Sequence, residues 1–160
     1  MSPGFLTDSE LGEFLNAPVN SEVLQVGRAA CGKVRDMCGP IFPLETVFEV
    51  VTVRRGWAPT RYQAVEITSL SGGSLPVDIT DFGFKSPSLS SGRVVVTYKA
   101  GYEVAPDWAV SAALIIARHL WRTRLGPNRN NPEAQPGVGY LVPNQAEALM
   151  ADHLLPRGLG

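Results

Sequence analysis

Cysteine is scarce in this chain of 160 residues, which contains only Cys31 and Cys38. Within a helical pattern their spacing places them two turns apart on one face, roughly 10 Å along the axis. That separation exceeds the span of a disulfide. No Cys-x-x-Cys pair and no nearby histidine provides metal-ligand spacing. We therefore expect both to be small core or interface residues in a reducing compartment.

An excess of charge of either sign is also missing. The chain has 14 Lys and Arg residues against 15 Asp and Glu residues, a formal net charge of −1. Domains dedicated to nucleic acid are usually strongly basic, so the balance argues against one. The charge is nevertheless uneven: residues 1–50 hold three basic and seven acidic side chains, and residues 51–100 hold six basic and three acidic ones. Such a polarised surface suits complementary contacts with protein neighbours.

Long apolar runs and catalytic motifs are absent as well. The longest strongly apolar run, residues 108–117, has about half of the roughly 20 residues that span a bilayer. The N-terminus has no basic or apolar region of a secretory signal, so we expect no membrane segment and no export. There is no phosphate-binding loop and no nucleophile elbow. His119 and His153 are isolated, so the sequence predicts no catalytic residue, cofactor or metal.

The N-terminal part of the chain predicts two helices that pack as a hairpin. Over 7–17, Thr7 and Glu10 fit a capping box. Over 21–38, apolar residues recur at three- and four-residue steps until Gly39-Pro40 ends the pattern.

From 45 to 102 the period changes to two, and β-branched residues become frequent. This pattern predicts a small antiparallel sheet inserted between helices. The expected strands cover 46–53, 61–70, 93–98 and, more weakly, 77–82. Polar loops at 71–76 and 85–92 separate them and are expected to be exposed.

The region 106–124 predicts a third helix that is apolar nearly all round and therefore buried on most sides. After it comes a loop rich in Gly, Pro and Asn over 126–143, a length typical of functional or disordered segments. Asn144 and Glu147 then fit the cap of a last short helix. The predicted fold class is α+β: a small bundle of helices with an inserted antiparallel sheet and an extended C-terminal arm. The predicted parts are a core domain, 1–125, and the arm, 126–160.

A group of arginines marks the end of the third helix and the start of the arm: Arg118, Arg122, Arg124 and Arg129. Two interpretations are open. The guanidinium groups can contact nucleic-acid phosphates, or they can complement the helix dipole and pair with acids of a neighbouring protein. We favour the second.

Three stretches carry a family resemblance. They are the capped opening helix Leu6–Leu11 with a following helix that ends at Cys38-Gly39-Pro40; the run Val96–Tyr102 followed by Pro106 and an apolar helix that closes at Trp121; and Gly137–Pro143 leading into Ala146 and Leu149. With these the chain resembles the head–tail connector proteins, also called head-completion or adaptor proteins, of long-tailed (siphovirus-like) bacteriophages.

This resemblance implies a non-enzymatic virion protein at the head–tail junction, assembled in the host cytoplasm. It implies a homo-oligomeric ring, commonly of twelve subunits, that lies under the portal protein and extends the DNA channel. Genomic double-stranded DNA would pass through without sequence-specific binding, and a stopper or another neck or tail protein would dock below. The arm would contact the portal, with Tyr140, Leu141, Leu149 and Leu154 as anchors, and the loops 71–76 and 85–92 would face the channel or the next protein.

Alternative interpretations remain. Within the structural class the chain could be another neck component, a stopper or a tail terminator. From other classes, it could be a small cytoplasmic enzyme or a nucleic-acid-binding accessory protein.

Overall fold

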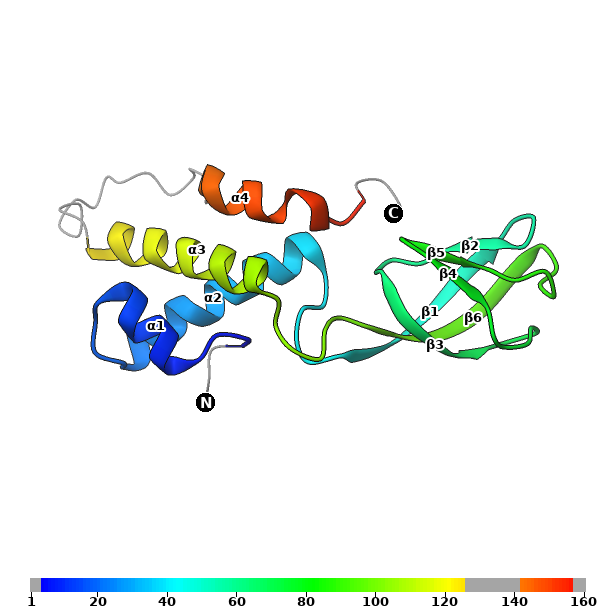
Figure 1. Cartoon of the computed structure of the whole chain (residues 1–160), viewed down its shortest axis with the longest axis horizontal. Coiled ribbons are helices and arrows are strands. Elements are labelled where there is room, and N and C mark those ends of the chain that lie inside the picture. Colours follow the sequence, from blue (N-terminus) through cyan, green and yellow to red (C-terminus); the bar gives the residue numbers. More distant parts are fainter. Residues whose placement is uncertain (1–3, 126–141, 157–160) are drawn as a thin grey trace. The chain divides into compact units, whose positions relative to one another are not determined.

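The computed structural model describes residues 4–125 and 142–156 (Figure 1). Contacts between Cα atoms group the chain into two units. The helical unit comprises Met1–Cys38 and Ala105–Leu154, and the β unit comprises Gly39–Val104 and Leu155–Gly160. The β unit is thus inserted in the sequence between two helices of the helical unit, which confirms the predicted α+β class with an inserted sheet.

The helical unit is built around one helix, α3. Its elements are α1 (Asp8–Leu15), α2 (Ser21–Cys38), α3 (Asp107–Leu125), α4 (Asn144–Met150) and a short 3-10 turn, η2 (Ala151–His153). Helix α3 contacts α1, α2 and α4. The side chains of Ala109, Ala112, Ala113, Ile116 and Ala117 are completely buried, and the small alanines let neighbouring helices approach closely. The prediction that this helix is the central element is confirmed, but burial on most sides is not: Val110, Leu114 and Ile115 are only half-buried.

Local signals placed the start of α1 correctly. The Glu10 N–H donates to Thr7 Oγ1 at 3.2 Å, and the Thr7 N–H donates to Glu10 Oε2 at 2.9 Å, which completes the predicted capping box. Asn16 adopts a left-handed conformation with φ of 50° and ends the helix at Leu15, two residues before the predicted end.

The predicted cap of the last helix is wrong. Helix α4 begins at Asn144 itself, Pro143 is the capping residue, and no side chain makes a cap hydrogen bond. The carbonyl of Pro143 accepts instead from the N–H groups of Ala146 and Glu147, at 2.9 and 3.0 Å. The fixed φ of proline favours this entry into the helix and moves Asn144 from the cap into the first turn.

The β unit contains two antiparallel three-stranded sheets. The larger sheet has the order β1 (Glu45–Val53), β6 (Gly92–Ala100), β3 (Ala64–Leu70), and the smaller has the order β2 (Trp57–Pro59), β5 (Gly83–Lys85), β4 (Asp78–Thr80). Strand β6 pairs with β1 over nine residues, from Glu45 opposite Ala100 to Val53 opposite Gly92. Apolar side chains of both sheets form one core, in which Phe84, Val96 and Tyr98 are fully buried.

The strand predictions hold for the long strands and fail for the short ones. Strand β3 begins at Ala64 rather than at 61, and its pairing with β6 is interrupted twice by irregular register. Strands β2 and β5 were not expected, and β5 reaches into the predicted loop 85–92. Three residues are too few to show a period of two, so pairing with neighbours defines these strands.

The contacts group the C-terminal segment differently from the predicted parts 1–125 and 126–160. Helix α4 packs on α3, with Ala146 and Met150 fully buried. These two apolar side chains account for the docking, because they remove apolar surface from water. The residues 126–141 of the predicted arm lie outside the described residues.

Candidate interaction surfaces

A buried hydroxyl organises the centre of the β unit. Tyr98 Oη donates to Glu49 Oε2 at 2.9 Å and accepts from the Tyr62 N–H at 3.3 Å. The same carboxylate oxygen accepts from the Arg61 N–H at 3.1 Å. Burial, followed by the hydrogen bond to Glu49, raises the pKa of Tyr98 far above its usual range. These groups satisfy one another and hold β1, β6 and the segment before β3 together, so we assign them a structural role.

The two loops singled out in the sequence, 71–76 and 85–92, lie against each other. Ser88 Oγ accepts from the Ser74 N–H at 3.4 Å and lies 2.8 Å from Ser86 Oγ. A Cβ atom at Gly73 would come within 2.6 Å of Leu89 Cδ2, so glycine permits this close approach. The structure therefore joins the two predicted contact loops into one surface. This surface is largely exposed, as predicted, except for the half-buried Gly73 and the buried Ser86 and Leu89.

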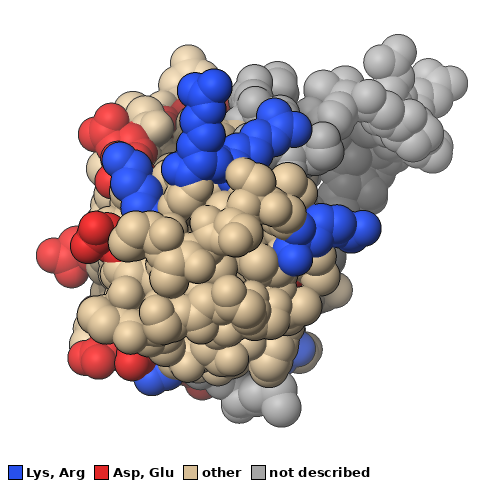
Figure 2. Space-filling view, turned by 90° about the vertical axis from the view of Figure 1, so that its right-hand side faces the viewer, with Lys and Arg blue, Asp and Glu red and all other residues tan. Residues whose placement is uncertain are grey.

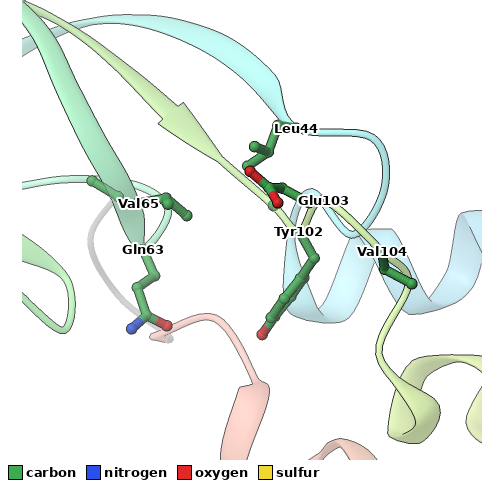
Figure 3. Close-up of a pocket in the computed structure, with 8 residues that line it drawn as sticks. Leu44, Gln63, Val65, Tyr102, Glu103 and Val104 are labelled. Atoms are coloured by element: carbon green, nitrogen blue, oxygen red, sulfur yellow. The ribbon is translucent and has the colours of Figure 1, made fainter.

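One hollow of the β unit has a volume of about 630 Å³. It is lined by Leu44, Gln63, Ala64, Val65, Gly101, Tyr102, Glu103 and Val104 (Figure 3). Gln63 and Tyr102 extend their polar ends in the same direction, and Glu103 supplies the single carboxylate (Figure 3). A nucleophile beside a general base is not found among these residues, and no group of three or more metal-ligating side chains occurs in the described part of the chain.

The arginine group of the sequence prediction divides into different environments. Arg118 Nη2 donates to the Phe14 carbonyl at 3.1 Å, and its guanidinium lies 4.0 Å from the centre of the Phe14 ring. Arg118 thus ties α3 to α1. Arg122 is exposed. The side chain of Arg124 and the whole of Arg129 lie outside the described residues, so a shared neighbour or phosphate contact of the four stays a prediction.

The four predicted portal anchors differ in their exposure, and only two of them lie within the described residues. Leu149 on α4 is 37% exposed, Leu154 is half-buried, and Tyr140 and Leu141 lie outside the described residues. Beside them, the rings of Trp108 and His153 stack with centroids 4.0 Å apart. The α4–η2 segment is therefore attached to α3 by one face and exposes Leu149 on another.

The sequence interpretation missed an exposed apolar patch on the larger sheet. We call Phe48, Val50 and Val95 the outer patch; their side chains are 75%, 54% and 46% exposed. Val50 lies opposite Val95, and Phe48 lies opposite Thr97. The signal was present in β1, where both alternating sets of residues contain apolar side chains, but alternation alone does not say which set faces the core.

Three arginines border the outer patch at one end of the β unit. Arg54 and Arg55 follow β1, Arg93 lies opposite Thr52, and all three are exposed. Figure 2, a view from the β-unit side, shows a broad uncharged surface with Lys and Arg at its upper and right edges and Asp and Glu along its left edge. The outer patch together with these three arginines is apolar and basic.

No helix within the described residues is long and apolar enough to cross a membrane. The architecture defines a class: an α+β protein whose helical unit is interrupted in sequence by a small antiparallel β unit. No family model and no curated protein sequence matches the chain.

Solved structures do match it. One, described as the neck of an empty GTA particle computed with C6 symmetry, has a TM-score of 0.64 and 16% identity, and the match covers 100% of this chain and 95% of that chain. Another, the neck of a native GTA particle computed with C12 symmetry, has a TM-score of 0.56 and 16% identity, with 96% and 93% covered. This chain has the fold of a protein from a GTA particle neck, which confirms at the level of the fold the resemblance inferred from the sequence.

Proposed function

We propose that this chain is a structural protein of the neck of a phage-like particle, where it forms a ring that joins head to tail. The observation that carries the proposal is the match in fold over the whole chain, which includes both units in the same order. A match confined to the helices would have supported only a common helical bundle. The step from this shared fold to an equivalent place in the neck is an inference by analogy, supported by the long coverage of both chains.

A structural role agrees with the chemistry of the described residues. Groups of the described residues whose pKa is displaced include Tyr98, Cys31, Cys38 and Lys99. Tyr98 and Cys31 are buried, and Lys99 is held by an ion pair with Glu66 at 2.8 Å. None of these groups faces a second reactive group across a hollow, as an enzyme site requires.

The proposal of a homo-oligomeric ring is supported by the C6 and C12 symmetry in the descriptions of the two similar structures. In a ring of this kind the portal protein lies on one side and a stopper or another neck or tail protein on the other. Genomic DNA would pass through the channel. A net charge of −1 suits such a passage, because a strongly basic ring would neutralise phosphates and hold the DNA.

The location that follows is the virion, at the head–tail junction, with assembly in the host cytoplasm. The segment 126–160 is the proposed contact with the portal. Because Ala146 and Met150 hold α4 on α3, the exposed side of α4 with Leu149 is the part of the described segment that can reach a partner.

Electron microscopy of the full chain mixed with the portal protein from the same genome tests the proposal. The expected result is a ring of this chain stacked directly on the portal. A ring found one layer further away would identify a stopper instead. Absence of the chain from purified particles, together with normal tailed particles when its gene is deleted, would overturn the proposal.

The contact through the arm has its own test. Removing 126–160 would also uncover α3, so point substitutions are the better choice. Leu149→Ser, Tyr140→Ser and Leu141→Ser are expected to weaken capture by the portal. Gln145→Ser, at another exposed position of α4, is the matched control. Unchanged capture by all three variants would remove the arm from the portal contact.

A further inference from the structure

We propose that the outer patch is the surface through which one copy of this chain binds the next. The complementary surface on the second copy is the acidic junction between α1 and α2, formed by Glu13, Val19 and Glu22. This inference rests on the proposed ring and names the two faces that close it.

The first observation is the composition of the exposed sheet face. Side chains alternate along a strand, so β1 and β6 present one face to the core and the other to solvent. The solvent-facing positions of the two strands are Thr46, Phe48, Val50, Thr52, Arg93, Val95, Thr97 and Lys99. They include apolar, hydroxyl and basic side chains but no acid. Phe48, 75% exposed, is the most exposed aromatic side chain of the described residues. Exposed apolar residues that adjoin in this way mark interaction surfaces.

The second observation is that the arginines beside this patch are unpaired. In residues 4–125 and 142–156, no ion pair or side-chain hydrogen bond engages the guanidinium group of Arg54, Arg55 or Arg93. By contrast, Lys99 at the other end of the same face is paired with Glu66. An exposed aromatic ring bordered by arginines has the composition that is enriched at the centres of protein interfaces.

The third observation is a surface of opposite charge on the helical unit. Residues 1–27 contain four acids and no Lys or Arg. Glu13 and Glu22 are exposed, and between them in sequence Val19 is 45% exposed. A Cβ atom at Gly12 would lie 2.9 Å from Val19 Cγ2, so Val19 packs over Gly12 beside Glu13. This junction is apolar and acidic, which complements the apolar and basic outer patch.

Pairing of two identical outer patches is disfavoured by charge. In either orientation the β1 and β6 faces would oppose basic side chains with basic ones, because Arg93 and Lys99 lie at opposite ends of the face. A contact between two different surfaces avoids this repulsion. Repetition of such a head-to-tail contact closes into a ring when the rotation between copies allows it.

A DNA backbone is the competing partner for the three arginines. Phosphates would engage the guanidinium groups but would leave Phe48, Val50 and Val95 in water. A second copy of the chain covers both the arginines and the apolar side chains, so the observations favour it. DNA binding is retained as an outcome of the test.

The test is a charge swap in the full chain. One variant carries Arg54→Glu and Arg93→Glu, the other Glu13→Arg and Glu22→Arg, and sedimentation velocity over a concentration series measures self-association. Each variant alone is expected to associate at least about tenfold more weakly than the unmodified chain. An equal mixture of the two, or one chain with all four changes, is expected to restore association, because every contact then pairs opposite charges. The matched control, Arg28→Glu with Lys33→Glu, changes the net charge equally on α2 and is expected to have no effect.

A photo-crosslinker at Val50 locates the contact, both in the isolated chain and in the ring on the portal. The expected product joins β1 of one copy to a peptide containing residues 13–22 of another.

A ring whose crosslinks lead elsewhere, or association that both charge variants retain, would overturn this inference and leave the proposed neck function intact. Association through these two surfaces, without any ring on the portal, would support this inference and overturn the proposed neck function. Salt-sensitive DNA binding that Arg54→Glu and Arg93→Glu abolish, with self-association unchanged, would also overturn it.

Discussion

The rings of Trp108 and His153 lie nearly parallel, with 6° between their planes and 4.0 Å between their centroids. Trp108 is in the first turn of α3, and His153 ends η2, so the pair fixes the C-terminal segment to the start of the central helix. Stacking thereby adds an aromatic contact to the burial of Ala146 and Met150.

Trp108→Ala is expected to lower the free energy of unfolding by about 2 kcal/mol, less than the roughly 3–5 kcal/mol of a fully buried tryptophan because Trp108 is only half-buried. His153→Ala is expected to cost about 1 kcal/mol through the stacking alone. Chemical denaturation measures both values. Hydrogen exchange should show faster exchange in α4 for both variants, and unchanged protection of α4 would contradict a docking role for this pair. Leu149→Ala, on the exposed side of α4, is the control.

Tyr98→Phe is expected to destabilise the chain by about 1–3 kcal/mol, because the Tyr62 N–H loses its acceptor and Glu49 loses a donor. Denaturant unfolding at neutral pH measures the loss. Glu49→Gln keeps an acceptor oxygen for Tyr98 and Arg61 and should cost less. Equal stability of Tyr98→Phe and the unmodified chain would show that these hydrogen bonds add nothing to the fold.

The same tyrosine predicts a pH dependence. Its pKa is raised in the folded state by burial, whereas in the unfolded chain a tyrosine ionises near pH 10. The stabilisation is therefore complete below about pH 10 and is lost as the pH rises further, because only the unfolded state releases the proton. Unfolding curves should show a decline in stability above about pH 10 that is smaller in Tyr98→Phe. A decline of the same size in both proteins would assign it to other groups.

Arg118→Ala is expected to loosen α1 from α3 at a cost of about 1 kcal/mol. The cost is small because the hydrogen bond from Arg118 to the Phe14 carbonyl is solvent-exposed, and exposed cation–π contacts contribute only about 0.5–1 kcal/mol. Faster hydrogen exchange in α1 should accompany the loss. Arg122→Ala, at an exposed position one turn further along α3, serves as the comparison and should leave α1 unchanged. An equal effect of the two substitutions would argue for a general charge effect.

The two thiols are expected to react slowly with alkylating reagents at neutral pH. Burial raises the pKa of Cys38 to about 11 and raises the pKa of Cys31 as well. Because the thiolate is the reactive form, the alkylation rate of Cys38 should rise with pH up to about 11. Mass spectrometry of alkylated peptides over a pH series measures this rise. A plateau near pH 8.5, the ordinary thiol range, would show that Cys38 is solvated.

Local features were predictable from the sequence to the extent that neighbouring residues determine them. The Thr7–Glu10 cap, the apolar run of α3 and the long strands β1 and β6 all depend on residues close in sequence. Strands β2 and β5 depend on pairing with distant segments, which three residues cannot signal. The start of α4 was mispredicted because Pro143 supplied the cap through its backbone.

The candidate surfaces were less predictable, since tertiary contacts decide exposure. The two Ser-rich loops were expected to be exposed, but their contact through Ser74 and Ser88 was not foreseeable from either loop alone. Arg118 was one of a group of cations in the sequence, and only the fold shows its partner, Phe14, which lies 104 positions away. The outer patch could not be predicted because β1 is apolar on both faces, and the sequence does not indicate which face the core covers.

Strand β6 is the middle strand of its sheet, and β1 and β3 pair with it rather than with each other. During synthesis this sheet cannot close until residue 100 has left the ribosome, although β1 emerges about a third of the chain earlier. Helices α1 and α2 must wait still longer for α3, against which both pack. The order of folding therefore differs from the order of the sequence: the inserted unit becomes complete first, and the unit that contains the N-terminus becomes complete afterwards.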